Sequence, residues 1–270
     1  MAAEKRDVGT DVVVLEVEDR VATITLNRPE AMNTMSRALS GGMSEAFRQV
    51  QEDPEIRVAI ITGTGRAFCA GADLKERAAS EAQGGPGMSP IAQLVKPSRG
   101  FGASGVTKPV IAAVNGYCLG GGMELALQCD ILIGSNEAAF ALPEIVHGFF
   151  PGGGGPQRLP RHIPHSMAME MILTGDRIDA ATAFRVGLIS RLTAAEDLLP
   201  TAKQIGTRIA RHAPLAIAAV KEVAYTSQEM ELGQSLRFGN LLRWVIGQTD
   251  DAKEGPRAFV ERREPNFKGQ

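Results

Sequence analysis

The feature that most constrains the fold is a pair of glycine-rich turns, each running from an apolar strand towards a helix. The first turn, residues 65–75, follows the apolar segment 58–62, and the second, residues 115–123, follows the apolar segment 109–114. Continuously apolar strands are expected where both faces of a sheet are covered. Strand, turn and helix repeated in this way predict an α/β fold in layers.

The same turns predict a catalytic site. A turn that enters a helix leaves backbone N–H groups without partners at the helix start. Two such donors aimed at one oxygen atom form an oxyanion hole. Glu124 follows the second turn directly, and Glu144 lies further along the chain. Two carboxylates beside such a hole can act as acid and base. The pattern therefore predicts an enzyme that stabilises an enolate and moves protons or water across the adjacent carbon–carbon bond.

Each of these features also has a purely structural interpretation. Glycines in the turns can simply allow a helix and a strand to pack closely. Glu124 can be an ordinary glutamate in the first turn of a helix, where the helix dipole favours it. The presence of both turns, and of Glu144 directly after Pro143, favours the catalytic interpretation.

Composition narrows the function classes. The 270 residues are 44% hydrophobic, enough for a large core, and 29 basic side chains balance 31 acidic ones. This balance argues against nucleic-acid partners and anionic membranes. No stretch approaches the roughly 20 apolar residues of a membrane span, and the N-terminus lacks an apolar signal region. Cys69, Cys118 and Cys129 match no zinc pattern, so we expect no metal, three buried free thiols and a cytoplasmic protein.

The rest of the chain divides into strands, helices and one long loop. A hairpin is expected over 11–17 and 21–26, and Ser36 should cap a helix that reaches about residue 52. Residues 78–105, rich in Gly, Ser, Ala and Pro, predict a loop that is either a lid or an unstructured insertion. Three further elements are a helix over 123–129 and strands over 131–134 and 138–142.

Helical patterns dominate from residue 166 onward. Helices are expected at 180–186, 198–212, 215–224, 232–246 and 252–263. The α/β pattern extends to about residue 165. We divide the chain into a core domain, residues 1–200, and a C-terminal helical region, residues 201–270.

Six motifs together resemble the crotonase family, the enoyl-CoA hydratases and isomerases. The resemblance covers nearly the whole chain and rests on residues 27–29, 66–75, 109–124, 143–144, 173–175 and 258–263. It implies a crotonase-like spiral of repeated strand–strand–helix units, followed by a C-terminal helical region for trimerisation and closure of the active site. It also implies an acyl-CoA thioester substrate, no cofactor, and a homotrimer or a homohexamer built as a dimer of trimers.

The resemblance assigns roles to residues. The N–H groups of Ala72 and Gly121 would bind the thioester oxygen, while Glu144 protonates C2 and Glu124 activates water. The backbone around Ala31 and Met32, with basic side chains nearby, would bind coenzyme A. Further implied substrate-binding residues are Arg66, Ala70, Asp73, Leu74, Lys75, Gly120, Pro143 and Gly152, with Phe259 and Lys268 reaching the CoA of a neighbouring subunit.

The leading expectation is a trans-2-enoyl-CoA hydratase. The run 141–144, Ala-Leu-Pro-Glu, resembles carnitinyl-CoA dehydratases, which hydrate crotonobetainyl-CoA, so a specialised hydratase is the alternative. An isomerase, which needs only one glutamate, and a non-catalytic acyl-CoA binder are less favoured because both glutamates are present. Phe149 and Phe150, where typical family members have smaller residues, either thicken the wall of the acyl site or belong to the core.

Overall fold

The computed structural model describes residues 3–82, 102–103 and 105–270, and its first elements follow the predicted pattern. Strands β2 (Val13–Glu18) and β3 (Val21–Leu26) form the expected hairpin, with Val13 opposite Leu26. Helix α1 (Arg37–Glu52) is capped by Ser36, whose side chain accepts a hydrogen bond from the Leu39 N–H. The apolar face of α1 is buried, as its periodicity predicts.

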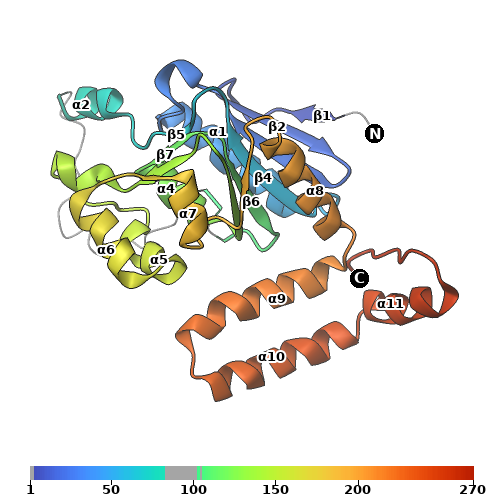
Figure 1. Ribbon diagram of the computed structural model, residues 1–270. Helices are drawn as coiled ribbons and strands as arrows, with labels where there is room; N and C mark the ends of the chain where they lie inside the picture. Colours follow the sequence, from blue (N-terminus) through green and yellow to red (C-terminus); the bar gives the residue numbers. More distant parts are fainter. Residues whose placement is uncertain (1–2, 83–101, 104) are drawn as a thin grey trace.

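In the described residues the strands form two sheets (Figure 1). The order of the seven-stranded sheet is β1-β2-β3-β4-β6-β8-β11, and that of the four-stranded sheet is β10-β9-β7-β5. The remaining strands of the large sheet are β1 (Glu4–Arg6), β4 (Val58–Gly63), β6 (Val110–Val114), β8 (Ile131–Ser135) and β11 (Arg191–Thr193). The small sheet contains β5 (Ala67–Cys69), β7 (Tyr117–Leu119), β9 (Ala139–Ala141) and β10 (Ile178–Asp179).

Successive units alternate between the sheets. In each of three units the first strand (β4, β6, β8) joins the large sheet and the second (β5, β7, β9) joins the small one. A helical segment follows: α2 (Leu74–Ala82), α4 (Gly121–Ala126) or the short 3-10 helix η2 (Pro143–His147). Because β5, β7 and β9 are parallel neighbours, the three segments that follow them leave the same edge of the sheet. This edge collects both glycine turns and both glutamates.

The core lies on both faces of the large sheet. Ala59 and Ile61 face α1 and the small sheet, while Val58 and Ile60 face helix α8 (Leu198–Ala210). Burial on both faces explains why β4 is continuously apolar. Cys69, Cys118 and Cys129 are buried and free, as predicted.

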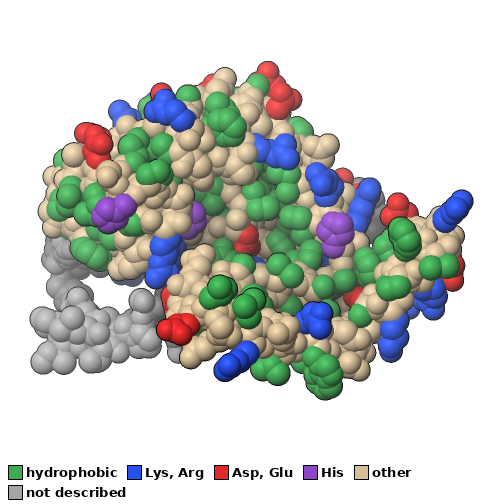
Figure 2. All heavy atoms as spheres, turned by 60° about the horizontal axis from the view of Figure 1, so that its bottom comes forward, with side chains coloured by type: hydrophobic (Ala, Val, Ile, Leu, Met, Phe, Trp, Pro, Cys, Tyr) green, Lys and Arg blue, Asp and Glu red, His purple; other side chains and the backbone are tan. Residues whose placement is uncertain are grey.

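Helices α9 (Pro214–Thr226), α10 (Leu232–Gly247) and α11 (Asp250–Glu261) project away from the sheets (Figure 1). They leave large apolar side chains exposed, including Val220, Trp244 and Phe259 at 69%, 68% and 85%. Figure 2 shows hydrophobic side chains over this part of the surface. The boundary at residue 200 falls inside α8, which packs on the large sheet, and the division into two domains stays a prediction.

Several predicted bounds need correction. Residues 78–82, predicted as the start of a loop, complete α2, and most of the predicted loop lies outside the described residues. Helix α4 starts at Gly121 and ends at Ala126, not at 123 and 129. Helix α5 (Gly155–His162) was not predicted, because prolines at 156 and 160 indicate a break; Pro156 occupies the first turn, where no N–H is needed. The helices predicted from residue 166 onward and over 180–186 are confirmed as α6 (His165–Thr174) and α7 (Ala180–Arg185).

Candidate active site

The two glycine turns are in contact. Strands β5 and β7 are parallel partners, with Cys69 opposite Cys118, so the turns that follow them emerge side by side. A Cβ atom added to Gly71 would lie 3.1 Å from the Leu119 carbonyl oxygen and 3.5 Å from the Gly121 nitrogen. Gly71 also has a φ of +96°, a left-handed conformation. Only glycine combines this conformation with so close an approach of two backbones.

Each turn presents an N–H group without an acceptor. Gly121 is the first residue of α4, and a first-turn N–H has no intrahelical partner. Ala72 lies between two hydrogen bonds, Met35 N–H to Gly71 O at 2.8 Å and Asp73 N–H to Met35 O at 3.3 Å. Among the residues that the structure describes, neither the Ala72 nor the Gly121 N–H donates to a protein acceptor. The structure thus brings the two predicted oxyanion donors to one edge.

Glu144 lies directly against the second turn. A Cβ atom on Gly120 would be 2.9 Å from Glu144 Oε1, so the carboxyl group contacts the backbone that precedes Gly121. Glu144 Oε2 is buried and has no hydrogen-bond partner among the described residues. A buried carboxyl oxygen without a partner is costly. Such a group is typical of a site completed by a bound molecule.

Glu124 is held by a further glycine-rich segment, residues 152–155. Its side chain is buried, at 4% exposure, and Oε1 accepts a hydrogen bond of 2.9 Å from the Gly155 N–H. Arg158 fixes this segment by donating to the Gly153 carbonyl oxygen at 2.8 Å. The sequence pattern did not predict these roles for Gly155 and Arg158. The run of four glycines before α5 was the available signal, but only Gly152 was selected from it.

Burial raises the pKa of both glutamates. For Glu124, burial outweighs the hydrogen bonds from the 153–155 backbone and the charge of Arg158, which lower the pKa. For Glu144, burial is again the main cause, and the negative charge of Glu124 raises the pKa further. Two carboxyl groups that repel each other in a buried site titrate as a pair, which favours a state with one proton between them.

These raised pKa values predict how stability depends on pH. The folded-state pKa values exceed the ordinary 4.5, so the native protein holds protons that the unfolded chain releases. The resulting stabilisation is complete below pH 4.5 and is lost as the pH rises through the raised values. Replacing both glutamates by glutamine should remove this part of the slope in melting temperature between pH 4.5 and 8. Glu137→Gln, an exposed control, should keep it; an unchanged slope in the double variant would contradict the assignment.

Most residues predicted to bind coenzyme A lie together near the first turn. Ala31 and Met32 end the short 3-10 helix η1 (Pro29–Ala31), and the Ala70 N–H donates to the Met32 carbonyl oxygen at 3.0 Å. Arg66 approaches the Met32 sulfur at 3.7 Å. Leu74 and Lys75 are exposed at the start of α2. The role of each in binding stays a prediction.

Three further predicted residues lie elsewhere in the chain. Gly152 belongs to the segment before α5 that holds Glu124. Phe259 is on α11, and the tail residue Lys268 lines a small pocket together with Pro54 and Pro214. Figure 1 places α11 far from α2 and α4. Within one chain the structure therefore does not bring Phe259 or Lys268 to the glutamates.

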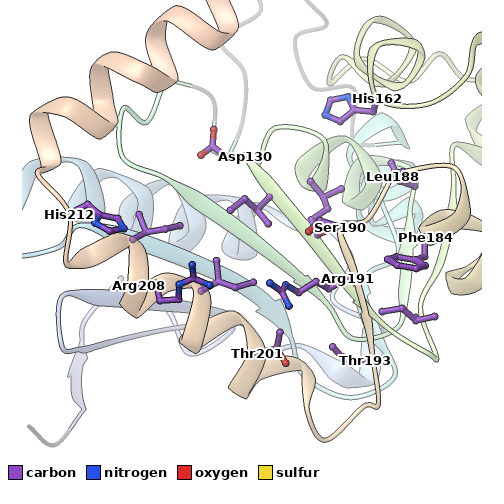
Figure 3. Close-up of a pocket in the computed structure, with 16 residues that line it drawn as sticks. Asp130, His162, Phe184, Leu188, Ser190, Arg191, Thr193, Thr201, Arg208 and His212 are labelled. Carbon is purple, nitrogen blue, oxygen red and sulfur yellow. Dashed lines mark hydrogen bonds between the residues drawn. The ribbon is translucent and has the colours of Figure 1, made fainter. Parts of the chain in front are cut away.

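A separate cavity of about 860 Å³ lies between α8 and the edge of the large sheet. Figure 3 shows Arg191 and Arg208 in its lining, with His212 at one end and Phe184 at the other. Neither glutamate nor either glycine turn lines it. In the described part of the chain no group of His, Cys, Asp and Glu side chains has the arrangement of a metal site. Among the same residues, none of the helices combines the length and the apolar composition of a membrane span.

Comparisons with known proteins identify the family. The family model described as enoyl-CoA hydratase/isomerase matches residues 16–270. The chain is 40% identical to the (E)-benzylidenesuccinyl-CoA hydratase of Thauera aromatica, covering 95% of this chain and 99% of that protein. It is 41% identical to the carnitinyl-CoA dehydratase of Proteus mirabilis, covering 95% and 98%.

Solved structures agree with the predicted fold. The enoyl-CoA hydratase of Mycobacterium tuberculosis superimposes with a TM-score of 0.87 at 38% identity, covering 97% of this chain and all of that one. An enoyl-CoA hydratase of Mycobacterium marinum gives the same TM-score at 37% identity. The predicted crotonase-like α/β spiral is confirmed. The chain belongs to the enoyl-CoA hydratase/isomerase family.

Proposed function

We propose that this chain is an enoyl-CoA hydratase, which adds water reversibly across the 2,3 double bond of a trans-2-enoyl-CoA thioester. The observation that carries the proposal is the unpartnered, buried Oε2 of Glu144, whose carboxyl group contacts Gly120. It lies at the sheet edge that also carries the unpaired N–H groups of Ala72 and Gly121, and the charge of Glu124 acts on it. The names of the relatives, which are hydratases and dehydratases of CoA thioesters, support the same reaction class.

In the proposed mechanism the thioester oxygen accepts hydrogen bonds from Ala72 and Gly121. These bonds strengthen as the oxygen gains enolate charge, so they lower the barrier instead of only binding the substrate. Glu124 accepts a proton from water as the water oxygen bonds to C3. Glu144 then gives its proton to C2 as the enolate collapses. The two carboxyl groups end the reaction with exchanged protonation states, and a new water molecule between them returns the proton.

This proposal does not specify the acyl group of the substrate. The names of the relatives include an aromatic substrate, benzylidenesuccinyl-CoA, and the product of crotonobetainyl-CoA hydration, carnitinyl-CoA. A further relative, the 2,3-dehydroadipyl-CoA hydratase of Escherichia coli, is 38% identical. The run Ala141 to Glu144 favours carnitinyl-CoA dehydratase as the second candidate, and an isomerase or a non-catalytic binder is less favoured because both glutamates are present.

We further propose a homotrimer, or a homohexamer formed by two trimers, acting in the cytoplasm without a cofactor in acyl-CoA breakdown. The exposed apolar side chains of α9, α10 and α11 support association through these helices. Association would also give Phe259 and Lys268 a role, because each is remote from the glutamates of its own chain and would reach the CoA of a neighbour.

The test is the loss of enoyl-thioester ultraviolet absorbance with crotonyl-CoA and, in parallel, with crotonobetainyl-CoA. Fast loss with crotonyl-CoA, absent in a Glu124→Gln/Glu144→Gln variant, is the expected result. Activity with crotonobetainyl-CoA alone would instead favour the carnitinyl-CoA dehydratase. Binding of both thioesters without turnover of either would contradict a hydratase of either kind.

A further inference from the structure

The peptide group that carries the Ala72 N–H is held by a segment far away in the sequence. The Gly71 carbonyl oxygen belongs to this peptide, and it accepts a hydrogen bond of 2.8 Å from the Met35 N–H. The C=O and N–H of one planar, trans peptide point in opposite directions. Fixing the Gly71 carbonyl towards Met35 therefore aims the Ala72 N–H away from Met35. The direction of the proposed oxyanion donor depends on where residues 28–35 lie.

Arg28 ties that segment to the residue after Ala72. Its Nη1 donates to Asp73 Oδ2 at 2.6 Å, and the two side chains are 25% and 10% exposed. The other carboxylate oxygen of Asp73 accepts the N–H groups of Lys75 and Glu76, both at 3.1 Å, and so caps α2. Asp73 was predicted to bind substrate, but its carboxylate already has three protein donors.

Asn33 also fixes the segment 28–35, through hydrogen bonds of its side chain. It is completely buried, with a left-handed φ of 54°. Its Oδ1 accepts the Arg28 N–H at 2.7 Å, and its Nδ2 donates to the carbonyl oxygens of Thr64 and Ala67 at 3.0 and 2.8 Å. Ala67 begins β5, the strand that leads into Gly71. The turn that carries Arg28 is thus bonded to both ends of the segment 64–73.

We propose that Arg28, acting through Asp73, is a positioning residue that sets the direction of the Ala72 N–H. The inference rests on the proposed function, because it assumes that this N–H binds the thioester oxygen. Arg28 holds Asp73 from one side while Met35 holds Gly71 and Asp73 through the backbone. Without the ion pair the turn around the peptide 71–72 is held only by backbone hydrogen bonds to Met32 and Met35. The peptide can then rotate away from the geometry that the reacting oxygen requires.

The experiment compares Arg28→Met, Asp73→Asn, the double variant and the conservative Arg28→Lys in the full chain. The carbonyl stretching frequency of bound, carbonyl-¹³C-labelled butyryl-CoA reports hydrogen bonding to the thioester oxygen directly, and this saturated thioester is not hydrated. We expect the red shift on binding to shrink in Arg28→Met and in Asp73→Asn. We expect kcat to fall on the order of 10-fold to 100-fold with a much smaller change in KM. Arg28→Lys should recover part of both.

The double variant and a matched control separate positioning from general stability. If the two residues act through each other, the double variant should be no worse than Arg28→Met alone. Arg6 and Asp53 form the matched ion pair, also 2.6 Å long, with side chains 22% and 23% exposed, between β1 and the end of α1. Arg6→Met should lower the melting temperature without changing the carbonyl frequency or kcat.

Two outcomes would overturn the inference, and they are distinguishable. A red shift in the unaltered protein that persists in full in Arg28→Met, with unchanged kcat and only a lower melting temperature, would show that the ion pair is structural. No red shift in the unaltered protein would refute the oxyanion donors themselves, and with them both the proposed mechanism and this inference.

Discussion

Glu144→Gln should lower kcat for enoyl-CoA hydration by about 10²-fold to 10⁴-fold, the usual contribution of a positioned proton donor. Glutamine has the same shape but no proton that can be transferred to C2. Its amide fills the place of the carboxyl group against Gly120, and no charge is lost that binds coenzyme A. The affinity for a CoA thioester, measured by calorimetric titration, should therefore change little. Stopped-flow absorbance at saturating substrate measures kcat separately.

Glu137→Gln is the matched control for this variant, because Glu137 is exposed in the turn between β8 and β9. It should leave both kcat and affinity unchanged. If Glu144→Gln weakens thioester binding as much as it slows turnover, Glu144 contributes to binding and not to proton transfer. Unchanged kcat would exclude Glu144 as the acid.

Ala72→Pro should lower kcat by about 10²-fold to 10³-fold, the effect of removing one oxyanion donor. Proline has no N–H, and the preceding residue, Gly71, tolerates restrictions on its backbone better than any other residue. The alanine N–H makes no hydrogen bond within the described protein, so the substitution breaks none of the bonds that hold the turn. Thioester affinity should fall far less than kcat, because the lost hydrogen bond strengthens only as charge develops.

The comparison variant at this position is Ala72→Gly, which keeps the N–H. Its kcat should exceed that of Ala72→Pro by at least tenfold, on the same physical grounds. Equal losses in the two variants would mean that the shape of the turn, and not its N–H, matters. A kcat for Ala72→Pro close to that of the unaltered protein would place the oxyanion hole elsewhere.

The helices and strands were predicted from patterns among neighbouring residues. The periodicity of α1 and the cap at Ser36 are local, and so is the continuous apolar run of β4, and all three are confirmed. Helix α5 was missed because its prolines at 156 and 160 argue locally against a helix. Its position in the tertiary structure is what holds the Gly155 N–H against Glu124.

For the C-terminal helices the sequence predicted the helices themselves but not their surroundings. The sequence predicted the helices now seen as α9, α10 and α11, with an apolar stripe on the first. A stripe shows that a helix has an apolar face, but not what covers it. In the single chain Val220, on that stripe, remains 69% exposed. The proposed association through these helices would cover it.

The sequence by itself determined the α/β class, the two glycine turns and the identity of the paired glutamates, because apolar periodicity and glycine conformation act over neighbouring residues. Only the tertiary structure decided that Gly71 approaches Gly121 and that Glu144 contacts Gly120, since these contacts follow from the pairing of β5, β7 and β9. The pairing of Asp73 with Arg28 was likewise decided by the tertiary structure. Arg28 lies 45 residues away, and a side chain's partner is set by what the fold places beside it.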